Sequence, residues 1–207
     1  MNKVLLFLTK AWLRLMKAKF IGVSEIKLPS GECQKVILFS SKEPLLLGQV
    51  TIFNTTIIHE GVFLSEKLLN YVIVHESAHK RQWYRYFIYP LVIIWFPGFF
   101  MLPLSLINIV RAVISSNSSE LIVAIYTLLF STIYFLIPFL YSWFLEFMAD
   151  YQAIKELGSQ YILEALSEFR SKRPQADLVS RILARMTHPP IEFTIAIYDF
   201  IKRRHSN

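Results

Sequence analysis

His75-Glu76-Ser77-Ala78-His79 is the stretch on which the rest of this chain depends. The residues before it, 68–74, read LLNYVIV, and this apolar run predicts a helix, over about 65–86, that continues through the motif. Residues four apart share a helix face, so the two imidazoles project together. They provide two corners of a tetrahedral zinc site, with Glu76 as a candidate general base. The alternative is a pair of buried histidines and an unrelated glutamate.

The composition favours a membrane protein. Of 207 residues, 54% are hydrophobic, the formal net charge is +7, and the mean hydropathy is +0.43. A basic chain can bind nucleic acid or an anionic membrane, and this hydrophobicity favours the membrane. No basic groove interleaved with aromatic residues accompanies the charge, so we expect no nucleic-acid partner. The single cysteine, Cys33, excludes an internal disulfide and a cysteine zinc cluster.

Two long runs without charged residues follow the motif, at 87–110 and 121–145. Each exceeds the roughly 20 residues that cross a bilayer as a helix, so together 87–145 are expected to form a transmembrane hairpin. The alternative is a buried hairpin in a soluble core. Of 22 Lys and Arg residues, only Arg111 lies inside this region. The positive-inside rule therefore predicts a cell-membrane protein with both termini and the active site cytoplasmic.

A second pair of candidate site residues follows the second apolar run directly. Glu146 and Asp150 are again four apart and share a helix face. Because an antiparallel hairpin returns the chain to the side it left, we expect Glu146 to reach the two histidines. It would be the third zinc ligand and leave the fourth position for water. Asp150 would accept the free ring N–H of a ligand histidine. The alternative for both is a solvated helix start.

The segments before the motif predict a helix and a small sheet. In residues 1–19, the basic residues fall on one helical stripe, which indicates an amphipathic helix on an anionic membrane surface. The alternative is a helix packed on the domain. Residues 20–64 contain β-rich runs, which predict a small antiparallel sheet within the catalytic domain. We expect an extended substrate to pair with the edge of this sheet, near Thr56, Ile57 and Ile58.

The last segment, 146–207, predicts the helical remainder of the catalytic domain, with helices at 160–170, 176–186 and 191–203. Thr187-His188-Pro189-Pro190 stands at a helix boundary, where His188 can donate a hydrogen bond to the oxyanion of a tetrahedral intermediate. By spacing alone it is a loop histidine. The expected fold is a mostly α membrane protein, with the transmembrane hairpin inserted in a zincin-like α+β catalytic domain.

Three motifs, HESAH at 75–79, EFMAD at 146–150 and THPP at 187–190, resemble the HtpX and CAAX prenyl protease group of integral membrane zinc metallopeptidases. The resemblance implies a cytoplasm-facing active site in which Glu76 is the catalytic acid/base and His188 contacts the transition state. It implies three zinc ligands, His75, His79 and Glu146. Many members carry an arginine after the His-Pro step, where this chain has Thr194. HtpX-type proteins also usually have a membrane hairpin before the catalytic helix.

The expected function is that of a zinc-dependent endopeptidase acting on membrane or membrane-proximal proteins, in quality control or processing. Its partners would be a protein or peptide substrate and the lipid bilayer. One alternative is a signalling protease that cuts a regulatory protein, because residues 43–79 also look like the BlaR-type antirepressor peptidases. Another is a non-catalytic membrane protein with a structural zinc site, but such sites are usually closed by four protein ligands.

Overall fold

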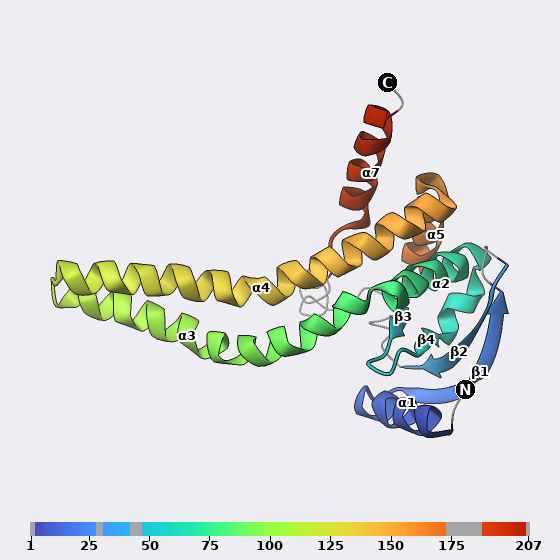
Figure 1. The fold of residues 1–207 in the computed structure, drawn as a ribbon, viewed down its shortest axis with the longest axis horizontal. Coiled ribbons are helices and arrows are strands. Elements are labelled where there is room, and N and C mark those ends of the chain that lie inside the picture. The colour runs from blue at the N-terminus through green and yellow to red at the C-terminus, as the bar shows by residue number, and fades with distance from the viewer. Residues whose placement is uncertain (1–2, 28–30, 42–46, 173–187, 206–207) are drawn as a thin grey trace. The chain divides into compact units, whose positions relative to one another are not determined.

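The computed structural model describes residues 3–27, 31–41, 47–172 and 188–205 (Figure 1). The chain divides into two compact units. We call Met1–Trp83 with Leu145–Asn207 the sheet unit, and Tyr84–Phe144 the helical unit. The protein is mostly helical with one small sheet, as expected. The helix expected at 176–186 lies outside the described residues.

The sheet has four strands in the order β1-β2-β4-β3. β1 pairs with β2 and β3 pairs with β4 in antiparallel fashion, but β2 and β4 are parallel. The prediction of an antiparallel sheet was therefore wrong in this one pairing. β3 and β4 form a hairpin, and its second strand, which is buried throughout, takes the central place beside β2. The strand bounds are Lys19–Lys27 (β1), Cys33–Ser40 (β2), Gly48–Val50 (β3) and Thr56–His59 (β4).

The central position of β4 corrects the predicted substrate contact at Thr56, Ile57 and Ile58. Ile57 pairs with Ile37 of β2 on one side and with Gln49 of β3 on the other. Backbone groups that are already bonded to two strands cannot pair with a peptide, so this strand is not the edge that a substrate would extend. The end of the expected β region, 20–64, also differs from expectation, because Glu60–Leu64 form the 3-10 helix η1.

Helices cover both faces of the sheet. Successive strand residues point to opposite faces, so Ile37 and Val36 belong to different cores. On one face, α1 (Lys3–Leu15) packs Leu13 against Ile37, Phe39 and Ile57. Packing on the domain was one of the two expectations for this helix, and its membrane-surface role stays a prediction. On the other face, α2 (Glu66–Arg81) packs against a core that includes Val36 and Ile58.

The helix α2 begins where the sequence predicts it but ends at Arg81, before the predicted end at residue 86, because Trp83–Phe87 form a separate 3-10 helix. The Ser65 side chain accepts a hydrogen bond from the Leu68 N–H and caps the first turn, and Glu66 follows it at the positive end of the helix dipole. Polar pairs join α2 to α5 (Ser159–Lys172), among them Asn70 with Tyr161. The last helix is α7 (Ile191–His205). The sheet unit thus holds α2 firmly between the sheet and α5.

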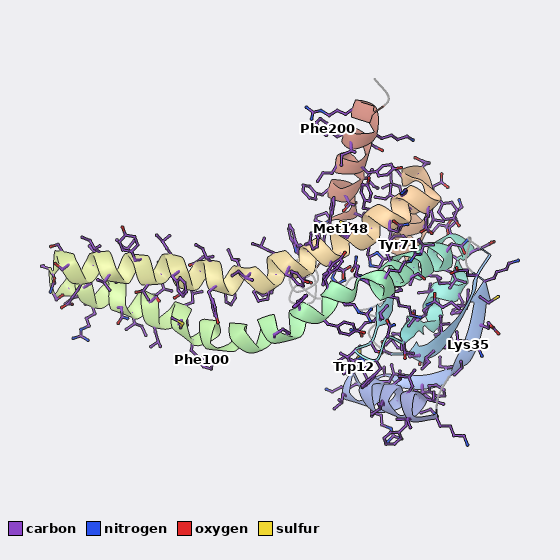
Figure 2. The ribbon with its side chains drawn as sticks, in the orientation of Figure 1. Trp12, Lys35, Tyr71, Phe100, Met148 and Phe200 are labelled. Carbon is purple, nitrogen blue, oxygen red and sulfur yellow. The ribbon has the colours of Figure 1, made fainter. Side chains whose placement is uncertain are left out.

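The helical unit contains α3 (Ile88–Ile114), preceded by the 3-10 helix η2 (Trp83–Phe87), and most of α4 (Ser118–Leu157). A hydrogen bond of 3.1 Å joins the hydroxyls of Ser105 and Ser131 across these two helices. Apolar side chains such as Phe100 protrude from them into the surroundings (Figure 2).

One described helix, α4, is long and apolar enough to cross a membrane. In α3, the described apolar stretch covers Phe100–Ile114. Many of the large apolar side chains on α4 are exposed, which suits a lipid environment better than water. The second span, the zincin-like identity of the sheet unit and the cytoplasmic orientation stay predictions.

Candidate metal centre

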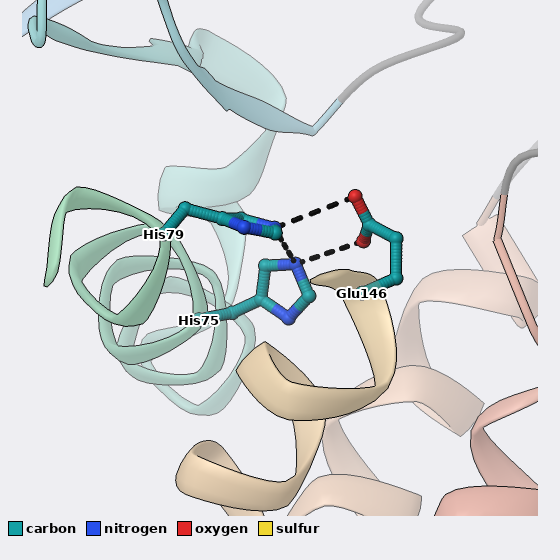
Figure 3. Close-up of side chains that lie close together, drawn as sticks. All are labelled: His75, His79 and Glu146. Atoms are coloured by element: carbon teal, nitrogen blue, oxygen red, sulfur yellow. Dashed lines mark hydrogen bonds and ion pairs between the residues drawn. The ribbon is translucent and has the colours of Figure 1, made fainter. Parts of the chain in front are cut away.

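Two helices of the sheet unit bring His75, His79 and Glu146 together (Figure 3). The histidines lie one turn apart on α2, and Glu146 lies on the part of α4 that belongs to this unit. One ligand atom from each residue lies within 4.8 Å of the others. The three side chains are largely buried, with 12% to 16% of their surface exposed. The three predicted ligands therefore form a cluster that can hold a metal ion.

Asp150 orients the first histidine. Its Oδ1 lies 2.8 Å from Nδ1 of His75 and also accepts a hydrogen bond of 2.9 Å from the Tyr71 hydroxyl. A carboxylate only accepts, so Nδ1 of His75 carries a proton, and in the neutral ring the lone pair of Nε2 faces the cluster. The sequence predicted the position of Asp150 but missed Tyr71 (Figure 2). Its place one turn before His75 is the signal that would have indicated it.

The distances in the cluster fit a cation. Nε2 of His75 and Nε2 of His79 lie 3.1 Å apart, and the two Glu146 oxygens lie 3.2 Å and 3.4 Å from them. Because the Nδ1 atoms hydrogen-bond to Asp150 and Gln82, neutral rings turn lone pairs toward each other and toward a carboxylate. Three converging acceptors are stable only around a positive charge, and this set of nitrogen and oxygen ligands suits a divalent metal such as zinc.

The charges of the centre raise the pKa of His75 and lower the pKa of Glu146. Burial alone would lower the pKa of His75, but hydrogen bonds with Asp150 and Glu146 outweigh it and raise that pKa well above its usual value. Burial would raise the pKa of Glu146, but the charge of His188 and hydrogen bonds from the two cluster histidines hold it well below its usual value. Protons and a metal ion therefore compete for the same negatively charged site.

Glu76 lies next to the first histidine and is 6% exposed. Burial raises its pKa above the usual value. Its Oε2 has no hydrogen-bond partner among the described residues, and a buried carboxylate oxygen in that state is available to a water or a substrate.

Gly48 on β3 makes room for Glu76. A Cβ at this position would lie 2.7 Å from Cγ1 of Val72 and 3.0 Å from Oε1 of Glu76. Only glycine lets the edge strand approach α2 this closely. Sequence reasoning missed this residue, because no local pattern links a glycine in a short strand to a distant glutamate.

His188 lies beside the cluster, three residues before the start of α7. Its Nε2 is 3.4 Å from Oε2 of Glu146, and 48% of its side chain is exposed. The structure thus brings His188, which was also predicted to be a site residue, to the cluster from a distant part of the chain. Its role as a transition-state contact stays a prediction. Thr194, which stands where many members of the resembling family have an arginine, is fully buried in α7.

No protein-family model matches this chain, and neither the curated proteins nor the solved structures include one that is similar to it. The family resemblance rests on the three sequence motifs.

Proposed function

We propose that this protein is a membrane-bound, zinc-dependent endopeptidase of the HtpX kind. The observation that supports this best is the cluster of His75, His79 and Glu146 with the buried carboxyl of Glu76 beside it. Three protein ligands leave a coordination position for water, which is the arrangement of a catalytic rather than a structural zinc site.

The residues around the cluster suit peptide hydrolysis. A bound zinc ion would polarise the scissile carbonyl and lower the pKa of its water. Glu76 takes a proton from the water whose oxygen attacks the carbonyl carbon, and passes it to the amine nitrogen as the C–N bond breaks. His188 donates a hydrogen bond to the developing oxyanion. Asp150 keeps the His75 ring in place during these steps.

An extended substrate is proposed to pair with β3 in place of the predicted β4. Among the described strands, β3 has one neighbour, and its other side is an open edge of the sheet. Gly48 on this strand lies next to Glu76. A peptide that adds to β3 therefore runs past the proposed base, and its backbone hydrogen bonds would give binding with little sequence preference.

Membrane attachment is proposed to come from the two apolar runs, 87–110 and 121–145. The exposed apolar surface of α4 supports this. The distribution of Lys and Arg supports cytoplasmic termini and a cytoplasmic active site. Membrane proteins and membrane-proximal chains are then the substrates within reach.

The test is metal content and casein hydrolysis of the full chain, purified in detergent. We expect about one zinc per chain, loss of hydrolysis after treatment with EDTA, and recovery when zinc is added back. Bound zinc without hydrolysis would favour a structural site in a non-catalytic membrane protein. Hydrolysis that survives complete removal of the metal would contradict the proposal.

A further inference from the structure

Gln82 is a buried polar residue that faces the metal centre. It is the C-cap of α2, three residues after His79, and only 5% of its surface is exposed. A buried amide costs free energy unless its hydrogen bonds are made. Both ends of this amide are bonded, and both bonds lead to the candidate centre.

The two bonds fix which way the amide points. Nε2 of Gln82 donates to the backbone carbonyl of Leu145 at 3.1 Å. A carbonyl only accepts, so the nitrogen end must face Leu145 and the oxygen end must face His79. Oε1 lies 2.9 Å from Nδ1 of His79. The proton of the His79 ring is therefore on Nδ1, and its Nε2 presents a lone pair to the cluster.

The same side chain connects the two helices that supply the ligands. Leu145 directly precedes Glu146, so the Gln82 amide ties the second histidine on α2 to the backbone beside the carboxylate on α4. Asp150 has the matching role for His75, but it reaches across from α4 to α2 as an anion. His75 is thus held by the charged Asp150 carboxylate, and His79 by the neutral Gln82 amide.

We propose that Gln82 is a positioning residue of the metal centre. It holds His79 as the Nδ1–H tautomer and fixes the orientation of this ring, while the bond to Leu145 sets the direction of the amide. The inference rests on the proposed function in one respect, namely that the centre binds zinc. It adds a residue that none of the three motifs contains.

Two substitutions separate the role toward the histidine from a merely structural one. Gln82→Met removes both hydrogen bonds at nearly constant side-chain length. Gln82→Glu loses the donor to Leu145 but keeps an oxygen that accepts from Nδ1 of His79. Gln152→Met is the matched control, because Gln152 lies on α4 and its amide donates to Glu156, which is not part of the cluster.

The experiment measures the zinc dissociation constant of each full chain in detergent, by competition with a chromogenic chelator. We expect Gln82→Met to weaken binding by roughly 10- to 100-fold, as is typical when a partner of a ligand histidine is lost. Gln82→Glu should bind close to the wild type, and Gln152→Met should equal it. The visible spectrum of the cobalt-substituted protein should change in Gln82→Met and be retained in Gln82→Glu.

Equal losses in Gln82→Met and Gln82→Glu would overturn the proposal, because these variants share only the loss of the Leu145 bond. If Gln82→Met does not fold, weak binding by Gln82→Glu alone is enough to overturn it. Unchanged binding in Gln82→Met overturns it as well and leaves the proposed function standing. A wild-type chain that binds no zinc overturns both.

Discussion

The two faces of the sheet are built on different principles. On the α1 side, the buried core consists of apolar residues such as Leu13, Ile37 and Phe39. On the α2 side, an apolar floor of similar residues also supports buried polar groups, among them Glu76 and Asp150. Thr9 on the α1 side is also buried, but its hydroxyl bonds to the backbone of its own helix. Burying a carboxyl costs more free energy than burying a hydroxyl, so the two buried carboxyls mark the α2 side as the candidate functional face.

Local hydrogen bonds make this cost tolerable on the α2 side. Ser77, inside the central motif, donates to Gln34 of β2, and Gln34 donates to Thr56 of β4. These bonds join α2 to the sheet, while His75 and His79 on the same helix lie close to Glu146 of α4. On the α1 face, the core contacts between helix and sheet are apolar, and buried Thr9 bonds within its own helix. Substitutions on the two faces should therefore separate chemistry from stability.

The largest effect is expected for Glu76→Gln on the α2 face. Removing the proposed base should lower the rate of casein hydrolysis by about 10²- to 10⁴-fold. Zinc content and the thermal unfolding midpoint should stay close to the wild type, because glutamine has the same shape and lacks the buried charge. If Glu76→Gln cleaves casein as fast as the wild type, Glu76 is not the base and the assignment of the chemistry to the α2 face is wrong.

Leu13→Ala on the α1 face is expected to lower stability and to leave the metal centre unchanged. Leu13 is fully buried, so its truncation should reduce the free energy of unfolding by about 2–5 kcal/mol, measured by denaturant titration. Zinc affinity of the folded protein should not change. Phe7→Ala on the same helix is the control, because Phe7 is 69% exposed and its loss should shift stability by less than about 0.5 kcal/mol.

Asp150→Ala should affect the centre and the fold together. The His75 ring loses its partner and the Tyr71 hydroxyl is left unbonded in the core. We expect zinc affinity to fall roughly 10- to 100-fold. Tyr71→Phe removes only the hydroxyl and should cost about 1 kcal/mol of stability, with a smaller change in affinity. Chelator competition measures the zinc affinity of both variants, and thermal melts measure their stability. A larger loss of zinc affinity in Tyr71→Phe than in Asp150→Ala would contradict the assignment of Asp150 as the partner that orients His75.

Gly48→Ala is expected to have the smallest effect and to concern the rate alone. The added methyl group must displace Val72 or Glu76, which should lower the hydrolysis rate roughly tenfold while zinc still binds. Gly22→Ala is a matched control on β1, because a Cβ there meets nothing within 4 Å. Similar rates in the two variants would remove Gly48 from the site.

The sequence predicted the parts of the centre that depend on helical periodicity. Residues four apart on one helix must share a face, and this alone places His75 with His79 and Glu146 with Asp150. We expected the two pairs to lie close together because an antiparallel hairpin over 87–145 returns the chain to the side it left. The parallel pairing of β2 and β4 could not be predicted, because strand order in a short hairpin depends on burial in three dimensions.

The supporting residues were harder to predict for a different reason. Tyr71, Gln82 and Gly48 act through the direction of a side chain or the absence of one. Tyrosine, glutamine and glycine have ordinary structural uses, so none of them forms a motif. Only the contacts in the folded structure distinguish them from their neighbours.

The three ligands of the centre are far apart in the chain, with Glu146 arriving long after His75 and His79. During synthesis, a ribosome-bound chain that ends before residue 146 carries two imidazoles but not the carboxylate that completes the cluster. Under the proposed function, hydrolysis would therefore have to wait until the long intervening segment has been made and has come back. A protease with this layout would not cleave its surroundings while it is being assembled.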